Sequence, residues 1–210
     1  MKIPQLDPNY AKLRRKQWPR AFRIGLAAVG VIWLVFLLDL LLPLSNYGVR
    51  PRTVDGLIGI ISMPFLHSGL AHIVNNSLPL MIAMTALYGN YPKTATKTVI
   101  LSTLFSGALV WLLAREVNHI GSSGLFYALL SYLFASGFFK KDIQSIGISL
   151  AIAFLYGGML YGLIPEDNGI SWEAHLYGFL VGLALAWKDR DRDKPKLKEW
   201  NWDEEEEEAV

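Results

Sequence analysis

Residues 119–134 read HIGSSGLFYALLSYLF, and the interpretation of the whole chain depends on this stretch. It contains four small residues, Gly121 to Gly124, and then runs directly into an apolar segment long enough to form a helix. Two interpretations fit the small residues. They allow close packing of a helix against its neighbour, and a serine on a turn bracketed by glycines is also well placed to act as a nucleophile.

The composition of the chain indicates a membrane protein. Its 210 residues are 52% hydrophobic and have a mean hydropathy of +0.30, which is too apolar for an ordinary water-soluble domain. There is no cysteine, which excludes disulfides, thiolate catalysis and cysteine metal sites. The first apolar segment follows a long basic stretch and lacks a small-residue cleavage site, so we interpret it as a retained helix and not as a signal peptide.

Alternating apolar segments and polar connections predict an all-α membrane protein with six transmembrane helices. A full crossing takes about 20 residues, so the fourth and sixth spans are short, and we expect their ends to lie inside the protein. The spans are expected at residues 21–44, 71–88, 98–114, 122–139, 143–164 and 172–187. The membrane domain then covers residues 21–187, between a basic tail (1–20) and a charged tail (188–210) whose acidic end is expected to be disordered.

Lysine and arginine residues set the predicted orientation. They are concentrated in residues 1–20, 93–97, 140–141 and 188–192, which all fall on one side of a six-span chain. The positive-inside rule makes this side cytoplasmic and places both termini there. Because these segments lie at membrane edges, anionic lipid explains their charge better than nucleic acid does.

Four polar residues within the spans are predicted to lie at one depth. The second, fourth and sixth spans all begin on the outside, so His72, Asn76, Ser123 and His175 lie near the outer ends of three helices. Polar residues at membrane depth usually mark function. A single site assembled from three helices would produce this agreement in depth.

Each of these residues also has a simpler interpretation. A serine in a span often bonds to its own helix or packs closely, and a histidine near the interface is often merely solvated, which is our expectation for His67 and His119. His175 differs because Gly178 and Gly182 follow it at spacings that share its face. This face predicts a tight helix contact, so His175 needs a partner there.

Ser123 is a fitting partner for that histidine. A serine hydroxyl becomes nucleophilic when a neutral imidazole takes its proton, and the start of a helix offers unpaired N–H groups to a developing oxyanion. Glu173 points elsewhere on its helix and Asp39 cannot be placed from the sequence, so we favour a Ser–His dyad.

Further residues support this arrangement. His72 and Asn76, four residues apart, share a helix face and can add two donors to the oxyanion site. Tyr127 lies one turn after Ser123 and either packs against the imidazole or is an ordinary core aromatic. His67 and His72 are five apart without an HExxH or acidic ligand pattern, so a metal site is the weaker interpretation.

Three motifs resemble those of the rhomboid family of intramembrane serine proteases, and the resemblance covers about residues 20–187. GSSG (121–124) looks like the family's GxSG motif, AHLYGFLVG (174–182) resembles its sixth-span motif, and HSGLAHIVNN (67–76) is similar to its second-span HxxxN element. The resemblance implies the following roles: Ser123 as nucleophile, His175 as base, His72, Asn76 and the Ser123 N–H as oxyanion donors, Tyr127 beneath the histidine, and Gly121, Gly124, Gly178 and Gly182 as supporting residues.

The resemblance also implies a function. It predicts a rhomboid-like six-helix bundle with a water-filled cavity open to the outside, which cleaves transmembrane protein substrates in or near their spans, without cofactor, in a prokaryotic cell membrane. The sequence VRPRT (49–53) departs from the Trp-Arg pair of many members. Two alternatives are a catalytically inactive rhomboid-like adaptor, which usually lacks the serine or histidine, and a small transporter, for which no inverted repeat is visible. The sequence does not determine the oligomeric state or the substrate.

Overall fold

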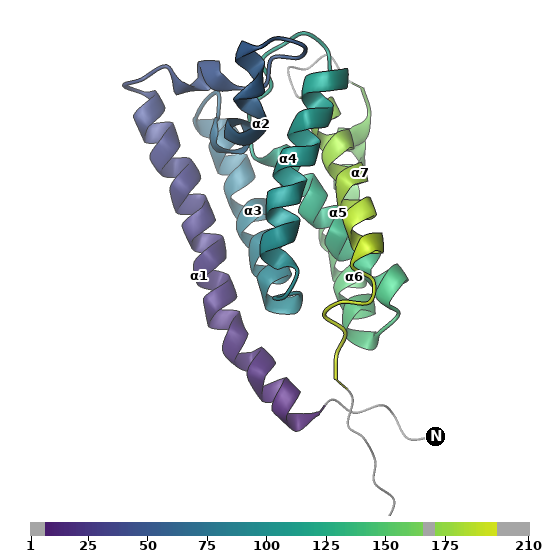
Figure 1. Cartoon of the computed structure of the whole chain (residues 1–210). Helices are drawn as coiled ribbons and strands as arrows, with labels where there is room; N and C mark the ends of the chain where they lie inside the picture. The colour runs from purple at the N-terminus through teal and green to yellow at the C-terminus, as the bar shows by residue number, and fades with distance from the viewer. Residues whose placement is uncertain (1–6, 166–170, 197–210) are drawn as a thin grey trace, which may run out of the picture.

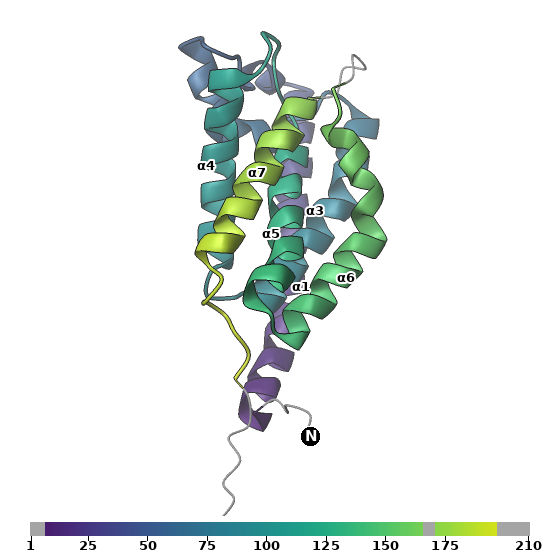
Figure 2. The same ribbon diagram turned by 90° about the vertical axis from the view of Figure 1, so that its right-hand side faces the viewer.

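The computed structural model describes residues 7–165 and 171–196, and these residues form a bundle of helices around α5 (Figures 1 and 2). The α-helices are α1 (Pro8–Asp39), α2 (Gly59–Ser62), α3 (Leu70–Asn90), α4 (Ala95–Leu113), α5 (Ser123–Lys140), α6 (Ile143–Tyr156) and α7 (Trp172–Lys188). The 3₁₀ helices are η1 (Leu44–Tyr47), η2 (Asp55–Leu57), η3 (Met63–Phe65) and η4 (Gly157–Leu163).

Four helical segments are long and apolar enough to cross a membrane. They are α1, α3, α4 and the continuous pair α6–η4 (Ile143–Leu163). Their outward surfaces carry large apolar side chains, with Leu150 and Phe154 of α6 67% and 89% exposed. Such exposure is unfavourable in water but suits contact with lipid chains. The chain is therefore an integral membrane protein.

Helix α5 occupies the centre of the bundle. It packs against α3, α4, α6 and α7, and Figure 2 shows it enclosed by these helices. Every residue from Gly124 to Leu133 is buried, and ten consecutive residues of an α-helix cover all of its sides. A helix that is apolar on all sides is suited to a buried position, which explains why this segment has no polar face.

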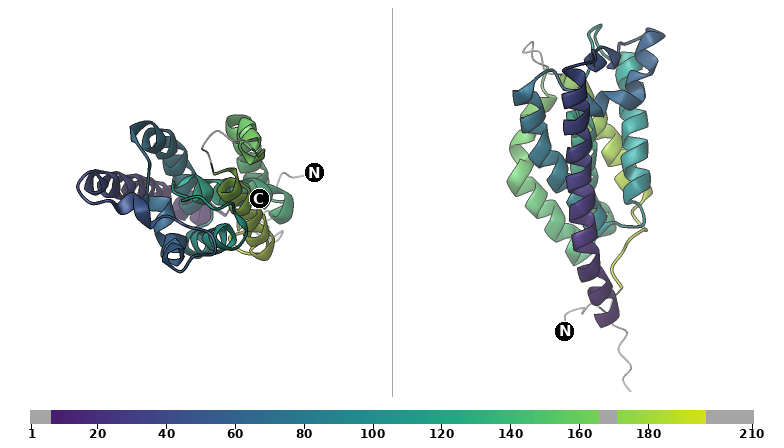
Figure 3. Two further views of the ribbon diagram at one scale, coloured as in Figure 1. Left: turned by 90° about the horizontal axis from the view of Figure 1, so that it is seen from above. Right: turned by 90° about the vertical axis from the view of Figure 1, so that its left-hand side faces the viewer.

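Helix α1 lies at the edge of the bundle and packs against α3. Figure 3 shows that it extends beyond the other helices at one end. It begins at Pro8 because the Asp7 side chain accepts hydrogen bonds from the N–H groups of Asn9 and Tyr10, and proline suits the first helical position. Residues 8–20, expected as a tail, are therefore helical and continuous with the first apolar segment.

A helix covers each of the other expected segments within a few residues. The fifth segment differs in that α6 changes to the 3₁₀ helix η4 at Gly157. The acidic end of the C-terminal tail lies outside the described residues.

Two connections are joined at the end of the bundle where α3, α5 and α7 begin. Val49 and His119 exchange backbone hydrogen bonds of 2.9 and 2.8 Å, and the Gly121 N–H donates to the Met63 carbonyl at 2.9 Å. These bonds hold the turn that precedes α5, and hence the position of Ser123.

Candidate active site

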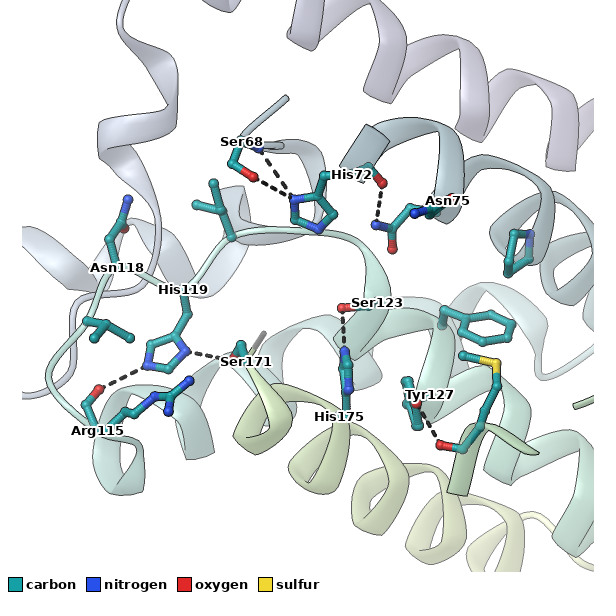
Figure 4. A pocket seen from close by; sticks show the side chains of 16 residues that line it. Ser68, His72, Asn75, Arg115, Asn118, His119, Ser123, Tyr127, Ser171 and His175 are labelled. Atoms are coloured by element: carbon teal, nitrogen blue, oxygen red, sulfur yellow. Dashed lines mark hydrogen bonds between the residues drawn. The ribbon is translucent and has the colours of Figure 1, made fainter. Parts of the chain in front are cut away.

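Ser123 and His175 contact each other at this end of the bundle. Ser123 is the first residue of α5, and His175 lies in the first turn of α7. The Ser123 Oγ and the His175 Nε2 are 2.9 Å apart, which is hydrogen-bond distance. Figure 4 shows the two side chains pointing toward each other from their separate helices.

Glycines allow α5 and α7 to approach closely enough for this contact. A Cβ atom on Gly178 would overlap the carbonyl oxygen of Gly124, and one on Gly182 would overlap that of Ala128. A Cβ on Gly124 would lie 3.1 Å from the Ala174 carbonyl oxygen. The two backbones are therefore in direct contact just below the Ser123–His175 pair, as in other small-residue helix interfaces.

Two further contacts orient the imidazole of His175. Its ring is stacked on that of Tyr127, with centroids 4.2 Å apart and planes 10° apart. Its Nδ1 lies 2.9 Å from the carbonyl oxygen of Gly162. Because a carbonyl only accepts, Nδ1 must carry the proton, which leaves the Nε2 lone pair facing the Ser123 hydroxyl. This is the tautomer in which the imidazole can act as a base toward the serine.

The turn before Ser123 requires glycine at position 121. Gly121 has φ of +116°, in the region that favours glycine. A Cβ atom there would also lie 2.7 Å from the His72 Nε2. Both backbone conformation and space therefore exclude a side chain, and the imidazole of His72 lies directly against the turn.

His72 and Asn76 extend from α3 toward the same region. The Nδ1 of His72 lies 3.1 Å from the Ser68 Oγ and accepts from the Ser68 N–H at 3.4 Å. Since an N–H only donates, the proton of the His72 imidazole is on Nε2, which faces the turn at Gly121. Asn76 donates one amide hydrogen to the His72 carbonyl at 2.8 Å, and an amide has a second hydrogen to offer.

A cavity of about 540 Å³ connects these residues. Its walls combine polar groups of three helices with apolar residues of α3, α5 and η4. The lining includes Ser68, His72, Asn76, Ser123, His175, Pro79, Phe126, Tyr127 and Met159. A concave site with a few converging polar groups is typical of an enzyme's substrate site. Figure 4 shows this cavity from close by.

Comparison with known proteins identifies the family. A sequence profile of the Rhomboid domain matches residues 55–192, which contain all nine predicted site residues. The chain belongs to the rhomboid family. It is 31% identical to an uncharacterized protein of Mycobacterium tuberculosis over 192 residues, covering 86% of this chain and 80% of the relative. An uncharacterized protein of Mycobacterium leprae is likewise 31% identical over 197 residues, covering 88% of this chain and 76% of the relative.

Two histidines of this rhomboid, expected to be exposed to solvent, are buried. We expected His67 and His119 to be solvated, but each is only 1% exposed, so that expectation was wrong. His119 is held by the backbone bridge to Val49, by a 2.6 Å contact with the Ser171 Oγ and by a 3.0 Å contact with the Arg115 carbonyl. The connection folds over the bundle end and removes both rings from solvent, which position in the sequence does not reveal.

The buried His67 packs against two residues next to the site, His72 and Ser122. Its ring meets that of His72 edge-on, with centroids 5.0 Å apart, and its Nε2 lies 3.4 Å from the Ser122 Oγ. Burial, with a smaller contribution from His72, lowers the pKa of His67 to about 4. The ring is therefore neutral near neutral pH and packs as an uncharged group against His72.

Two acidic residues that were considered as orienting groups do not contact His175. Glu173 is buried, and its carboxylate pairs with Arg115 at 3.2 Å. Asp39 accepts a hydrogen bond from the Ser45 N–H at 2.7 Å, at the end of α1. Among the described residues, no group of three or more histidine, cysteine, aspartate or glutamate side chains is arranged to hold a metal ion.

Sequence reasoning missed Gly162, Met159 and Ser68. Gly162 and Met159 contribute carbonyl groups to His175 and Tyr127, and the backbone and hydroxyl of Ser68 contact His72. Carbonyl and N–H groups occur on almost every residue. The sequence alone therefore does not indicate which backbone groups contact His175, Tyr127 and His72 in this rhomboid.

Proposed function

We propose that this rhomboid is an intramembrane serine endopeptidase that cleaves transmembrane protein substrates in or near their spans. The observation that carries the proposal is the 2.9 Å contact between the Ser123 Oγ and the His175 Nε2, with the opposite nitrogen of the imidazole held by a carbonyl. Nucleophile, base and an orienting group together form the arrangement required for acyl transfer.

In the first half of the reaction, the Ser123 Oγ attacks the carbonyl carbon of the scissile peptide bond. The His175 Nε2 takes the hydroxyl proton as the new C–O bond forms. Negative charge develops on the substrate oxygen, and the His72 Nε2–H, the free Asn76 amide hydrogen and the Ser123 N–H supply donors for it. His175 then gives its proton to the leaving amine as the C–N bond breaks.

In the second half, water from the cavity hydrolyses the acyl enzyme and releases the acyl product. His175 takes a proton from the water as the water oxygen attacks the ester carbon, and it returns the proton to the Ser123 Oγ as the ester C–O bond breaks. The enzyme is regenerated without a redox step or cofactor. The polar lining of the cavity is suited to admitting water at this depth.

We further propose that α5 and α7 cross the membrane together with the four long apolar segments. Helix α5 is enclosed by its neighbours, so it can cross without meeting lipid, and α7 packs along it. This makes six spans, with the basic residues and both termini in the cytoplasm and the cavity open to the outside. The mycobacterial relatives favour a bacterial cell membrane.

The activity is tested with purified protein, a fluorophosphonate probe and a helical transmembrane substrate. We expect wild type to be labelled and to cleave, whereas Ser123→Ala and His175→Ala lose both activities. Ser122→Ala is the matched control because it removes the neighbouring hydroxyl, and it should keep both. Normal cleavage by Ser123→Ala would overturn the proposal. If Ser122→Ala loses cleavage to the same extent as Ser123→Ala, the assignment of Ser123 as the nucleophile is wrong.

The orientation is tested with single cysteines, since the chain has none of its own. Val54→Cys lies on the exposed loop near the cavity, and Lys93→Cys lies on the exposed connection at the opposite end. A membrane-impermeable maleimide should label Val54→Cys in intact cells and Lys93→Cys only after permeabilisation. The reverse pattern would contradict the orientation.

A further inference from the structure

The 3₁₀ helix η4 presents two different surfaces. Its outward side carries Leu160 and Tyr161, which are 56% and 77% exposed. On the inward side, the carbonyl of Met159 accepts from the Tyr127 Oη at 2.7 Å and that of Gly162 accepts from the His175 Nδ1 at 2.9 Å. The two stacked rings are thus each bonded to the same short segment.

We infer that Gly162 is a positioning residue for the proposed Ser–His dyad and that its lack of a side chain is what the dyad requires. The inference rests on the proposed function. The carbonyl of Gly162 holds the proton of His175 on Nδ1 and keeps Nε2 free to receive the Ser123 proton. An orienting acceptor of this kind is usually a carboxylate in serine hydrolases, and here a backbone group takes that place.

Space around Gly162 explains why the residue must be glycine. A Cβ atom at this position would overlap the Tyr127 Oη, and it would lie 3.2 Å from the Tyr127 Cζ and 3.3 Å from the His175 Nδ1. Tyr127 cannot easily move because its ring is stacked on the imidazole at 4.2 Å. Any side chain at 162 therefore pushes η4 away and stretches both hydrogen bonds together.

The same segment supplies a matched control. Gly158 also belongs to η4, and a Cβ atom added to it would meet no other atom within 4 Å. Gly158→Ala and Gly162→Ala therefore make the same chemical change in the same 3₁₀ helix. They differ only in whether the new methyl group meets the Tyr127–His175 pair.

The first experiment compares the kinetics of the two variants with wild type on a helical substrate. For Gly162→Ala we expect kcat to fall about tenfold or more while KM stays within about twofold, because a base in the wrong tautomer affects chemistry and not binding. Gly158→Ala should match wild type in both constants. Equal kcat for Gly162→Ala and wild type would overturn the inference.

A compensating substitution separates this role from general instability. Tyr127→Phe removes the atom that a Cβ at 162 would overlap and keeps the stacked ring. The double variant Gly162→Ala with Tyr127→Phe should therefore have a higher kcat than Gly162→Ala alone. If the double variant is as slow as or slower than Gly162→Ala, the steric part of the inference is wrong.

A spectroscopic measurement tests the tautomer without any need for activity. In ¹⁵N-histidine-labelled protein, the neutral His175 ring should show a protonated Nδ1 in wild type and Gly158→Ala, and a shift toward protonated Nε2 in Gly162→Ala. The His175→Ala spectrum identifies the signal among the four histidines. A wild-type ring protonated on Nε2 would refute the inference. If the wild-type tautomer is as expected but no probe labelling or cleavage occurs, the proposed function fails and the inference about the ring stands.

Discussion

The Ser123 hydroxyl and the His175 imidazole form a 2.9 Å contact although the residues are 52 positions apart in the chain. The contact joins the start of α5 to the first turn of α7. It depends on backbone-to-backbone packing at Gly124 and Gly178, directly beneath it. The geometry of the pair is therefore a property of the helix interface as much as of the two side chains.

Gly178→Ala should separate the two helices and remove activity. The added Cβ overlaps the Gly124 carbonyl oxygen, which is backbone and cannot turn aside. We expect a loss of about 1–3 kcal/mol in the free energy of unfolding and loss of fluorophosphonate labelling, measured by denaturant unfolding in detergent and by gel fluorescence. The control is Gly147→Ala on α6, where a Cβ meets nothing within 4 Å. Wild-type stability and labelling in Gly178→Ala would contradict this account of the interface.

His72→Ala should slow catalysis without weakening substrate binding. In the proposed mechanism, the imidazole donates from Nε2 only to the oxyanion, so kcat should fall about 10²–10³-fold with KM little changed. Steady-state kinetics on the helical substrate measure both constants. Val74→Ala, at a half-exposed position of the same helix, serves as the control. A rise in KM with unchanged kcat would show that His72 binds substrate instead.

The buried His67 should make the protein less stable in acid. Burial lowers the pKa of His67 from 6.5 to about 4 in the folded protein. The unfolded chain therefore binds the proton first as the pH falls, and the stability present above pH 6.5 is lost progressively toward pH 4. Unfolding temperatures followed by tryptophan fluorescence should decrease over this range.

His67→Gln isolates this contribution, because glutamine keeps polar atoms in the site and does not titrate. We expect its unfolding temperature to decrease less between pH 6.5 and pH 4 than that of wild type. Parallel curves for the two proteins would show that His67 is not responsible for the acid sensitivity.

Asp193→Ala should destabilise the end of the bundle opposite the cavity. The Asp193 carboxylate accepts from the N–H groups of Lys93 and Thr94 at 3.0 and 3.1 Å and from the Thr94 hydroxyl at 2.8 Å, where α4 begins. Loss of a charged acceptor at the start of a helix should lower the free energy of unfolding by about 1–2 kcal/mol. Asp191→Ala is the control, since that side chain is 73% exposed and its pairing with Lys194 is worth little. Equal unfolding temperatures for the two variants would exclude a capping role.

Local features of the sequence were sufficient to predict most of the helices and the family. Helices cover the expected apolar segments after the first within a few residues, because segment length and hydropathy are local properties. The first apolar segment was expected to begin at residue 21, but its helix already begins at Pro8. The basic residues after Pro8 were interpreted as a tail, whereas Asp7 and Pro8 are themselves a helix start that the hydropathy pattern concealed.

By itself, the sequence determined the membrane class and the rhomboid resemblance. It also predicted Ser123 and His175 at one depth, because the spans that carry them begin on the same side of the membrane. Only the tertiary structure decided how the imidazoles are oriented and which connections are buried. His175 is oriented by the Gly162 carbonyl and His72 by the Ser68 N–H, while a backbone bridge encloses His119. Backbone donors and acceptors are common to nearly all residues. Packing in three dimensions therefore decides which of these groups bond to each other, and the sequence does not specify the pairing.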